Sequence, residues 1–174
     1  LGDATVNANL IIDGSTLDLN GFILMTLGVQ YLNDGIVIDN GGQLIIIYNG
    51  PEWYVSSEGS DTDNDGSEGE PFASIQHGID AANDEDTVHV AAGTYVENIN
   101  FSGKNITVSG EDRETTIIDG SQSGTVVIFD SGETTEAVLT GFTITNGGGS
   151  YSGGGISIVS SNPTIDNLIV ENNS

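Results

Sequence analysis

The stretch "ITVSG", residues 106–110, places apolar Ile106 and Val108 on either side of a polar residue and ends in a turn. The same pattern returns as "FTITN" (142–146), "ISIVS" (156–160) and "LIVEN" (168–172). Side chains alternate between the two faces of a strand, so the apolar members of each triplet are predicted to face one core. A short strand can bury that face by stacking on another coil about 4.8 Å away. The predicted inward residues are Ile106, Val108, Phe142, Ile144, Ile156, Ile158, Leu168 and Val170.

The stretch "PFASIQHGIDAAND", residues 71–84, interrupts the strand pattern and predicts one short helix. Pro71 suits a first-turn position, and Glu68 and Glu70 precede it, where carboxylates interact favourably with the positive helix end. Gly78 costs roughly 1 kcal/mol relative to alanine inside a helix, so tertiary contacts must hold this one. Its predicted apolar face consists of Phe72, Ile75, Ile79 and Ala82.

Three long stretches resemble a known family. They are "WYVSSEGSDTDNDGSEGEPFASIQHGIDAA" (53–82), "DTVHVAAGTYVENINFSGKNITVSGEDRETTIIDG" (86–120) and "AVLTGFTITNGGGSYSGGGISIVSSNPTIDNLIVENN" (137–173). They are similar to bacterial secreted or surface proteins of the pectin-lyase-like superfamily. The resemblance implies an all-β fold, a right-handed parallel β-helix whose N-terminal mouth is closed by a capping α-helix. Because this architecture hosts lyases, glycosidases, adhesins and inert surface repeats, it does not decide activity.

The first fifty residues form a different module. Glycines recur about every seven residues and separate short runs such as "FILMTL" and "IVIDN", and Asn-Gly and Asp-Gly steps favour tight turns. Local signals leave open whether these strands pair antiparallel or wind in parallel. We therefore predict a Gly-punctuated β-strand module at 1–50, followed by the capped β-helix at 51–174. The C-terminal end of the β-helix is expected either to continue or to be covered by a partner.

The charge balance limits the partners and the compartment. The chain has 26 acidic and 2 basic residues, a formal net charge of -24. Two basic residues cannot neutralise a phosphate backbone, which excludes nucleic acid as a main partner. The chain contains no run of 18 apolar residues, so membrane insertion is not predicted. Self-repulsion costs less where salt or divalent cations screen it, so a secreted or cell-surface location is expected.

The acidic loop "DTDNDGSEGE", residues 61–70, is a candidate calcium site. Alternate carboxylates followed by glycine match the first half of an EF-hand-type loop, and Ca²⁺ takes six to eight oxygen ligands. The second half departs, because Phe72 stands where the closing glutamate would be. The alternative is a solvated acidic turn; an ion here is expected to fasten the loop to the helix. The predicted ligands are Asp61, Asp63, Asp65, Glu68 and Glu70.

No catalytic residue is predicted. A lyase needs a base beside a uronate carboxylate, and a hydrolase needs clustered acids. The available bases are Lys104, Arg113, His77, His89 and the tyrosines; the first two are expected to pair with neighbouring carboxylates, and the histidines are expected to be structural. The acids that stacking could bring together are Asp119, Asp130 and Asp166.

Two further side-chain sets receive structural interpretations. Asparagines at coil ends are expected to hydrogen-bond along the solenoid rather than to bind a ligand. They are Asn146, Asn162, Asn167 and Asn172. Trp53, Tyr95 and Tyr151 are isolated in the sequence, so no aromatic platform for sugar stacking is predicted.

The pattern as a whole favours a non-catalytic extracellular structural or adhesive β-helix protein, a subunit of a scaffold, filament or array. Self-association through strand edges or solenoid ends is expected, because exposed strand edges pair with other chains. The alternative is a polysaccharide lyase or glycoside hydrolase whose catalytic coils are incomplete or absent here. A polyuronate would meet a surface of its own sign, which opposes binding unless calcium bridges the two. A non-catalytic glycan-binding module is the third possibility.

Overall fold

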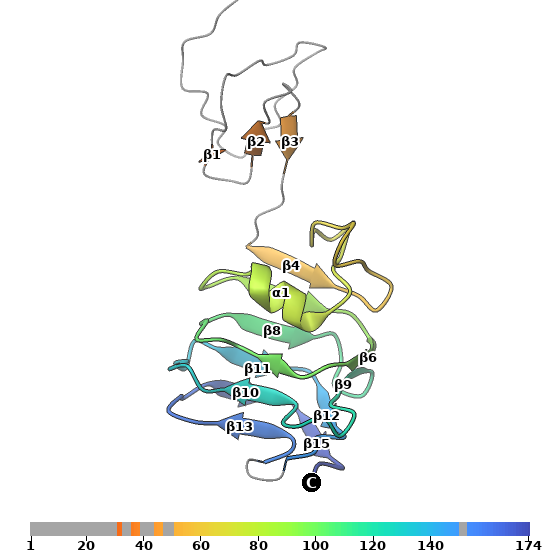
Figure 1. The fold of residues 1–174 in the computed structure, drawn as a ribbon, viewed down its shortest axis with the longest axis vertical. Helices are drawn as coiled ribbons and strands as arrows, with labels where there is room; N and C mark the ends of the chain where they lie inside the picture. The colour runs from red at the N-terminus through yellow and green to blue at the C-terminus, as the bar shows by residue number, and fades with distance from the viewer. Residues whose placement is uncertain (1–30, 33–35, 39–43, 47–50, 150–152) are drawn as a thin grey trace, which may run out of the picture. The chain divides into compact units, whose positions relative to one another are not determined.

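The computed structural model describes residues 31–32, 36–38, 44–46, 51–149 and 153–174. The chain divides into two compact units, Leu1–Ile46 and Ile47–Ser174. In the first unit, β1 (Tyr31–Leu32), β2 (Ile36–Ile38) and β3 (Leu44–Ile46) form an antiparallel sheet (Figure 1). These three strands therefore pair antiparallel, whereas the sequence had left antiparallel pairing and parallel winding both open. The other residues of the predicted 1–50 module lie outside the described part.

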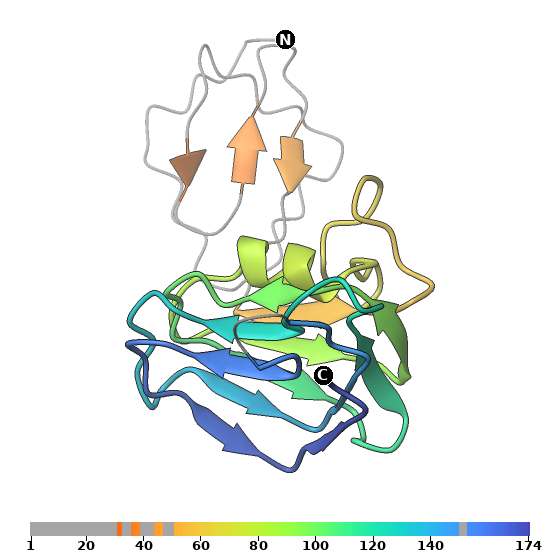
Figure 2. The same ribbon diagram turned by 60° about the horizontal axis from the view of Figure 1, so that its bottom comes forward.

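The second unit is a solenoid of three parallel sheets (Figures 1 and 2). The five-stranded sheet contains β4 (Glu52–Val55), β5 (Thr87–Val90), β8 (Thr107–Gly110), β11 (Val138–Thr140) and β14 (Thr164–Asp166). The four-stranded sheet contains β6 (Gly93–Val96), β9 (Thr116–Asp119), β12 (Thr143–Thr145) and β15 (Ile169–Glu171). The third sheet contains β7 (Ile99–Asn100), β10 (Val127–Phe129) and β13 (Ile156–Ile158). The predicted all-β parallel β-helix is confirmed.

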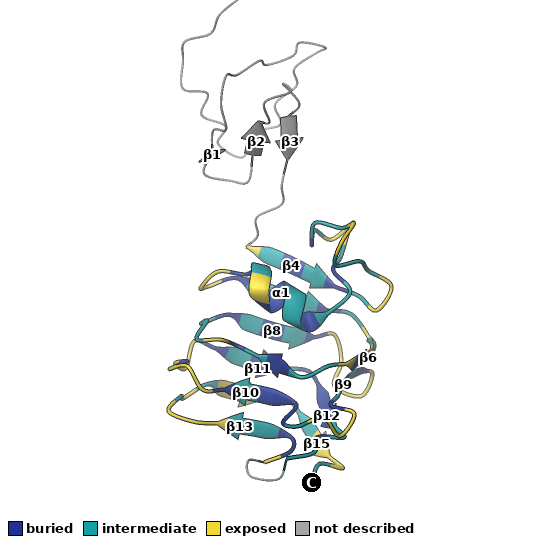
Figure 3. Cartoon of the chain, viewed as in Figure 1, coloured by how far each residue is buried: buried dark blue, intermediate teal, exposed yellow. Residues whose placement is uncertain are grey.

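The core consists of in-register columns of apolar side chains, one residue from each coil. Val88, Val108 and Leu139 are direct partners across β5, β8 and β11, and all three are fully buried. Phe101 and Phe129 continue the core beside the third sheet, with ring centroids 4.3 Å apart. In Figure 3 buried segments alternate with partly exposed ones along the strands. Among the predicted inward residues, the buried ones are Ile106, Val108, Phe142 and Ile144.

The inward residues of the edge strands are less buried. Ile158 pairs with Phe129, and Val170 pairs with Ile144, so both occupy core columns. They are nevertheless 47% and 51% exposed, because β13 and β15 are edge strands and no described coil covers their outer side. The period-2 pattern therefore predicted the direction of these side chains correctly, but not their exposure.

The helix α1 (Ile75–Ala81) begins later than Pro71 suggested. Phe72 forms a parallel bridge with Val55, which keeps the residues before the helix extended, and Ser74 is the N-cap. The predicted apolar face is confirmed: Phe72, Ile75, Ile79 and Ala82 are buried. Within the described residues, no helix has the length and apolar character to cross a membrane.

Gly78 shows why this helix carries a glycine. It is buried between Val55 of β4 and Val88 of β5, and a Cβ there would lie 2.9 Å from the Val88 side chain. The helix thus lies close against the first two strands of the five-stranded sheet. The conformational cost of Gly78 is offset because the glycine lets the helix approach the strands more closely than a larger residue would allow.

Candidate functional site

The first residue of the acidic loop, Asp61, holds the chain that enters α1. Its Oδ1 accepts hydrogen bonds from the main-chain N–H groups of Ala73 (2.7 Å) and Ser74 (3.1 Å). Its Oδ2 accepts from Ser74 Oγ at 2.7 Å. Ser74 Oγ in turn accepts from the N–H of His77, as an N-cap does. The first acidic residue of the loop thus joins the loop to the helix through protein atoms alone.

A second carboxylate reaches the same helix end from a different coil. Glu97, which follows β6, accepts hydrogen bonds from the N–H of Ile75 at 2.9 Å and of Gln76 at 3.0 Å, one on each carboxylate oxygen. These are two of the N–H groups that a helix leaves without an internal partner, and a negative charge suits them. Glu68 and Glu70 were predicted to interact with the positive end of α1. Glu97 makes this interaction instead, and Glu68 and Glu70 are exposed.

Lys104 fastens the opposite end of α1. Its Nζ donates to the carbonyl oxygens of Ile79 (2.7 Å), Asp80 (2.8 Å) and Ala82 (2.7 Å). The prediction that Lys104 pairs with a neighbouring carboxylate is wrong, because the last helical carbonyls occupy its three N–H bonds. We call Asp61, Glu97 and Lys104 the cap clasp: carboxylates bind the positive helix end and an ammonium binds the negative end.

The two carboxylates of the clasp have opposite pKa shifts. For Asp61, burial acts to raise the pKa, but hydrogen bonds from Ser74 and Ala73, with the nearby His77, lower it below the ordinary value of 3.8. For Glu97, burial raises the pKa above 4.5; hydrogen bonds from Gln76 and Ile75 oppose the rise, and the Asp61 charge adds to it. The two groups therefore respond differently to pH, although both hold one helix end.

The other predicted metal ligands do not form one site. Asp63 Oδ2 accepts from Ser60 Oγ at 3.1 Å, and Asp65 Oδ1 accepts from the N–H of Ser67 at 3.0 Å. Within the described residues, no three Asp, Glu or His side chains converge in a way that could hold a metal ion. The calcium hypothesis stays a prediction, and it would need main-chain oxygens in addition to these carboxylates.

A cleft of about 610 Å³ lies on the outer face of the five-stranded sheet, and we call it the lateral cleft. The parallel register places Tyr54 beside His89 and His89 beside Ser109, so one row of side chains forms its floor. The Tyr54 and His89 rings stack with centroids 5.1 Å apart and an interplanar angle of 26°. As predicted from its alternation with two buried valines, His89 faces outward, and its Nε2 lies within hydrogen-bond distance of a Glu52 carboxylate oxygen.

The walls of the lateral cleft carry negative charge. Glu68 of the acidic loop and Pro71, which follows the loop, line it, as does Glu111, which directly follows β8. One Glu111 oxygen accepts from the N–H of Ala92 at 3.0 Å, and this contact fixes the carboxylate at the rim. The lining contains no lysine or arginine.

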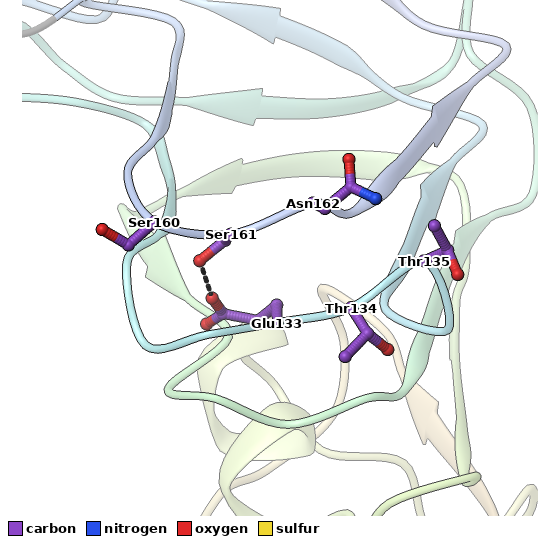
Figure 4. A pocket seen from close by; sticks show the side chains of 6 residues that line it. All are labelled: Glu133, Thr134, Thr135, Ser160, Ser161 and Asn162. Atoms are coloured by element: carbon purple, nitrogen blue, oxygen red, sulfur yellow. Dashed lines mark hydrogen bonds between the residues drawn. The ribbon is translucent and has the colours of Figure 1, made fainter.

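A second hollow, of about 420 Å³, lies between two coils at turns that follow β10 and β13 (Figure 4). Hydroxyl and amide side chains line it, together with Glu133, which is only 1% exposed. Glu133 accepts hydrogen bonds from Gly103 N, Ser131 N and Ser161 Oγ. Burial acts to raise its pKa, but these hydrogen bonds lower it below 4.5. The carboxylate thereby joins turns of three successive coils.

The remaining catalytic candidates do not assemble. His77 packs edge-on against Phe72, with centroids 4.5 Å apart, in line with its structural interpretation. Arg113 is exposed and has no ion pair among the described residues, contrary to the expectation of a carboxylate partner. The three aspartates, of which stacking could have brought two together, lie at strands of three different sheets: Asp119 ends β9, Asp130 follows β10 and Asp166 ends β14.

The aromatic residues were partly misjudged. Trp53 is buried, stacks on Phe72 at 5.8 Å and donates from Nε1 to Asp86 at 3.0 Å, so it is not isolated. Tyr95 is buried and donates to the Ala91 carbonyl. Tyr151 lies outside the described residues. The half-buried, outward-facing pair, Tyr54 with His89, was missed; the register of β4 with β5 is the signal that reveals it.

The asparagines at coil ends serve turns and stacking. Asn146, Asn167 and Asn172 have φ values of 55°, 49° and 56°. Asparagine tolerates this left-handed region better than most residues. Asn146 also donates to Asp119 of the preceding coil at 3.0 Å, which agrees with the predicted bonding along the solenoid.

These features define a parallel β-helix protein, and this architecture is similar to that of the pectin-lyase-like type. Residues 57–102 match a family model described as "Protein of unknown function (DUF1565)", which is a parallel β-helix family of this type. The matched stretch contains α1, Asp61 and Glu97, and it stops two residues before Lys104. No curated protein matches the chain.

Proposed function

We propose that the protein is a non-catalytic structural or adhesive β-helix protein of the cell exterior, a subunit of a scaffold, filament or array. The observation that carries this proposal is how the reactive side chains are used. Lys104 binds helical carbonyls, His77 packs on Phe72, and Glu133 joins three coils. These three side chains, each of which could serve as an acid or a base, hold the solenoid together instead.

The charge supports an exterior location. A net charge of -24 on 174 residues makes the chain repel itself, and screening by salt or divalent cations lowers that cost. Calcium bound by some of Asp61, Asp63, Asp65, Glu68 and Glu70 would both neutralise charge and tie the loop to the cap. Asp61 and Asp65 would retain hydrogen bonds to the main chain while doing so.

Self-association is proposed through β13, β14 and β15, on the side where no described coil pairs with them. These strands are the edges of the three sheets, and the exposed Ile158, Ile165 and Val170 belong to them. An unpaired edge strand offers main-chain groups to another chain. The opposite end of the solenoid is shielded by α1.

The second candidate is a polysaccharide-active enzyme, and the lateral cleft is the observation that favours it. A groove on the outer face of a sheet, with Tyr54, His89 and Glu111, could hold a sugar chain. The test is turnover of a panel of neutral and acidic polysaccharides, with and without calcium, measured as new reducing ends or unsaturated products. The scaffold proposal expects no turnover by the native protein. Turnover that His89→Ala abolishes would overturn it in favour of the enzyme.

A further inference from the structure

We propose that the lateral cleft binds an organic cation, the ammonium or guanidinium group of a lysine or arginine side chain on a partner protein. The inference rests on the proposed adhesive function and names the kind of partner it would contact. It starts from the floor of the cleft, where Tyr54 and His89 present stacked rings in a space of about 610 Å³.

The floor suits a cation because of the Tyr54 ring. An aromatic ring attracts a cation held within about 6 Å of its centroid, through the negative charge of its π face. The half-buried Pro71 and Ala91 add apolar lining, which a lysine or arginine stem can contact while its charged head stays polar. A bare metal ion would gain nothing from this apolar lining.

The walls supply the counter-charge. Glu68 lies on the acidic-loop side and Glu111 after β8, and Glu111 is fixed by its hydrogen bond to the N–H of Ala92. Glu68 makes no hydrogen bond or ion pair with the described residues, so its carboxylate is available. With no lysine or arginine in the lining, the charge is negative on both sides of the ring pair. Grooves lined by one sign of charge concentrate the field and raise the local concentration of the opposite ion.

The cleft disfavours acidic partners for the same reason. An anionic polysaccharide would bring carboxylates against Glu68 and Glu111 with no basic side chain to receive them. A basic protein segment brings complementary charge, and it also matches the whole surface, since the chain carries 26 acidic residues against 2 basic ones. Charge complementarity therefore selects the basic segment as the occupant.

The test is titration of the ¹⁵N-labelled full chain with blocked tripeptides, acetyl-Gly-Arg-Gly-amide and acetyl-Gly-Lys-Gly-amide, at about 0.15 M salt, where exposed charges are screened beyond about 8 Å. The expected result is saturable amide shifts at Tyr54, His89, Ser109 and Glu111. The neutral acetyl-Gly-Gln-Gly-amide should leave these amides unchanged. Shifts spread over all acidic turns without saturation would overturn the proposal, because they would indicate a diffuse counterion atmosphere.

Matched variants distinguish the contribution of the Tyr54 ring to peptide binding from that of the carboxylate charge. Tyr54→Leu should weaken peptide binding about two- to fivefold, the range expected for a cation–π contact at an exposed site, whereas Tyr54→Phe should retain it. Glu111→Gln should weaken binding, whereas Glu136→Gln, which removes the same charge at an exposed position outside the cleft, should not. Equal losses for Glu111→Gln and Glu136→Gln would contradict a specific site.

Two further probes identify the source of the ligand. Free butylamine binding more tightly than the lysine peptide would overturn the assignment to a partner's side chain. A neutral oligosaccharide such as maltohexaose that shifts the same amides, while the peptides do not, would overturn the choice of a cation. None of these variants lies in β13, β14 or β15, so self-association measured on them stays wild type even if peptide binding fails. The cleft proposal and the scaffold proposal can therefore fail separately.

Discussion

Lys104 Nζ donates a 2.7 Å hydrogen bond to the carbonyl oxygen of Ile79, and through it a turn of the solenoid holds the C-terminal end of α1. The helix has no basic residue in its own last turn and no acidic residue in its first. Its ends are served by charges from elsewhere: Lys104 lies 25 residues beyond Ile79, and Glu97 lies 22 residues beyond Ile75. The cap is therefore a tertiary structure rather than a locally stable helix, consistent with its seven-residue length.

Lys104→Met should destabilise the fold by about 1.5 to 3 kcal/mol, the range for hydrogen bonds that involve a charged group. The substitution keeps most of the stem but leaves the carbonyls of Ile79, Asp80 and Ala82 without their donor. Urea unfolding measures the change. Arg113→Met removes the same charge from an exposed position and should stay within about 0.5 kcal/mol of wild type. Equal effects from the two substitutions would mean that net charge, not the clasp, matters.

Asp61→Asn should destabilise the fold more at neutral pH than at acidic pH. The folded-state pKa of Asp61 lies below its ordinary value of 3.8, so its contribution is present above that value and is lost as pH falls through the lower folded pKa. The melting temperature of the variant should thus lie well below wild type at pH 7 and approach it as pH falls below 3.8. A constant difference across this range would show that the Asp61 charge is not what holds the helix entry.

Glu97→Gln should show the opposite trend with pH. The folded-state pKa of Glu97 is raised above 4.5, so its contribution is fully present below that value and is lost as pH rises through the folded pKa. As pH rises from 4 toward 7, the melting temperature of the variant should therefore improve relative to wild type. Differential scanning calorimetry at several pH values measures this. A difference that moves against the variant over this interval would contradict the raised pKa.

Gly110→Ala should destabilise the solenoid by about 1 to 3 kcal/mol, as overpacking does. Gly110 ends β8, and a Cβ there would collide with the main-chain carbonyl of Gly141 on the next coil, which cannot move as a flexible side chain would. Gly69 is the matched control, since a Cβ at that position meets nothing within 4 Å. Gly69→Ala should leave the midpoint of urea unfolding nearly unchanged, and a loss equal to that of Gly110→Ala would refute the close-approach explanation.

The repeating parts of this fold could be predicted from the sequence, whereas the contacts that occur only once could not. Alternation predicts which way Val108 or Ile144 points, because period 2 is a local property that each coil repeats. The clasp depends on pairs such as Asp61 with Ala73 and Glu97 with Ile75, which only the wound chain brings together. A helix with no acidic residue in its first turn and no basic residue in its last turn was the available signal, because such a helix needs partners from other segments.

The candidate binding surface was missed for a related reason. Tyr54 follows buried Trp53, and His89 follows buried Val88, so each looks like an ordinary outward residue when its strand is considered alone. Once Trp53 is aligned with Val88, Tyr54 and His89 must be neighbours. The sequence contains both halves of the aromatic pair, but the register joins them.

The central claim, a structural protein that assembles with itself outside the cell, is tested most directly by molar mass in solution. Multi-angle light scattering over a wide concentration range, in millimolar calcium and then in excess chelator, gives that mass. We expect species larger than one chain in calcium. On chelation we expect either less assembly or a lower melting temperature. A single chain at every concentration, unaffected by calcium or chelator, would contradict both the scaffold and the metal it was proposed to use.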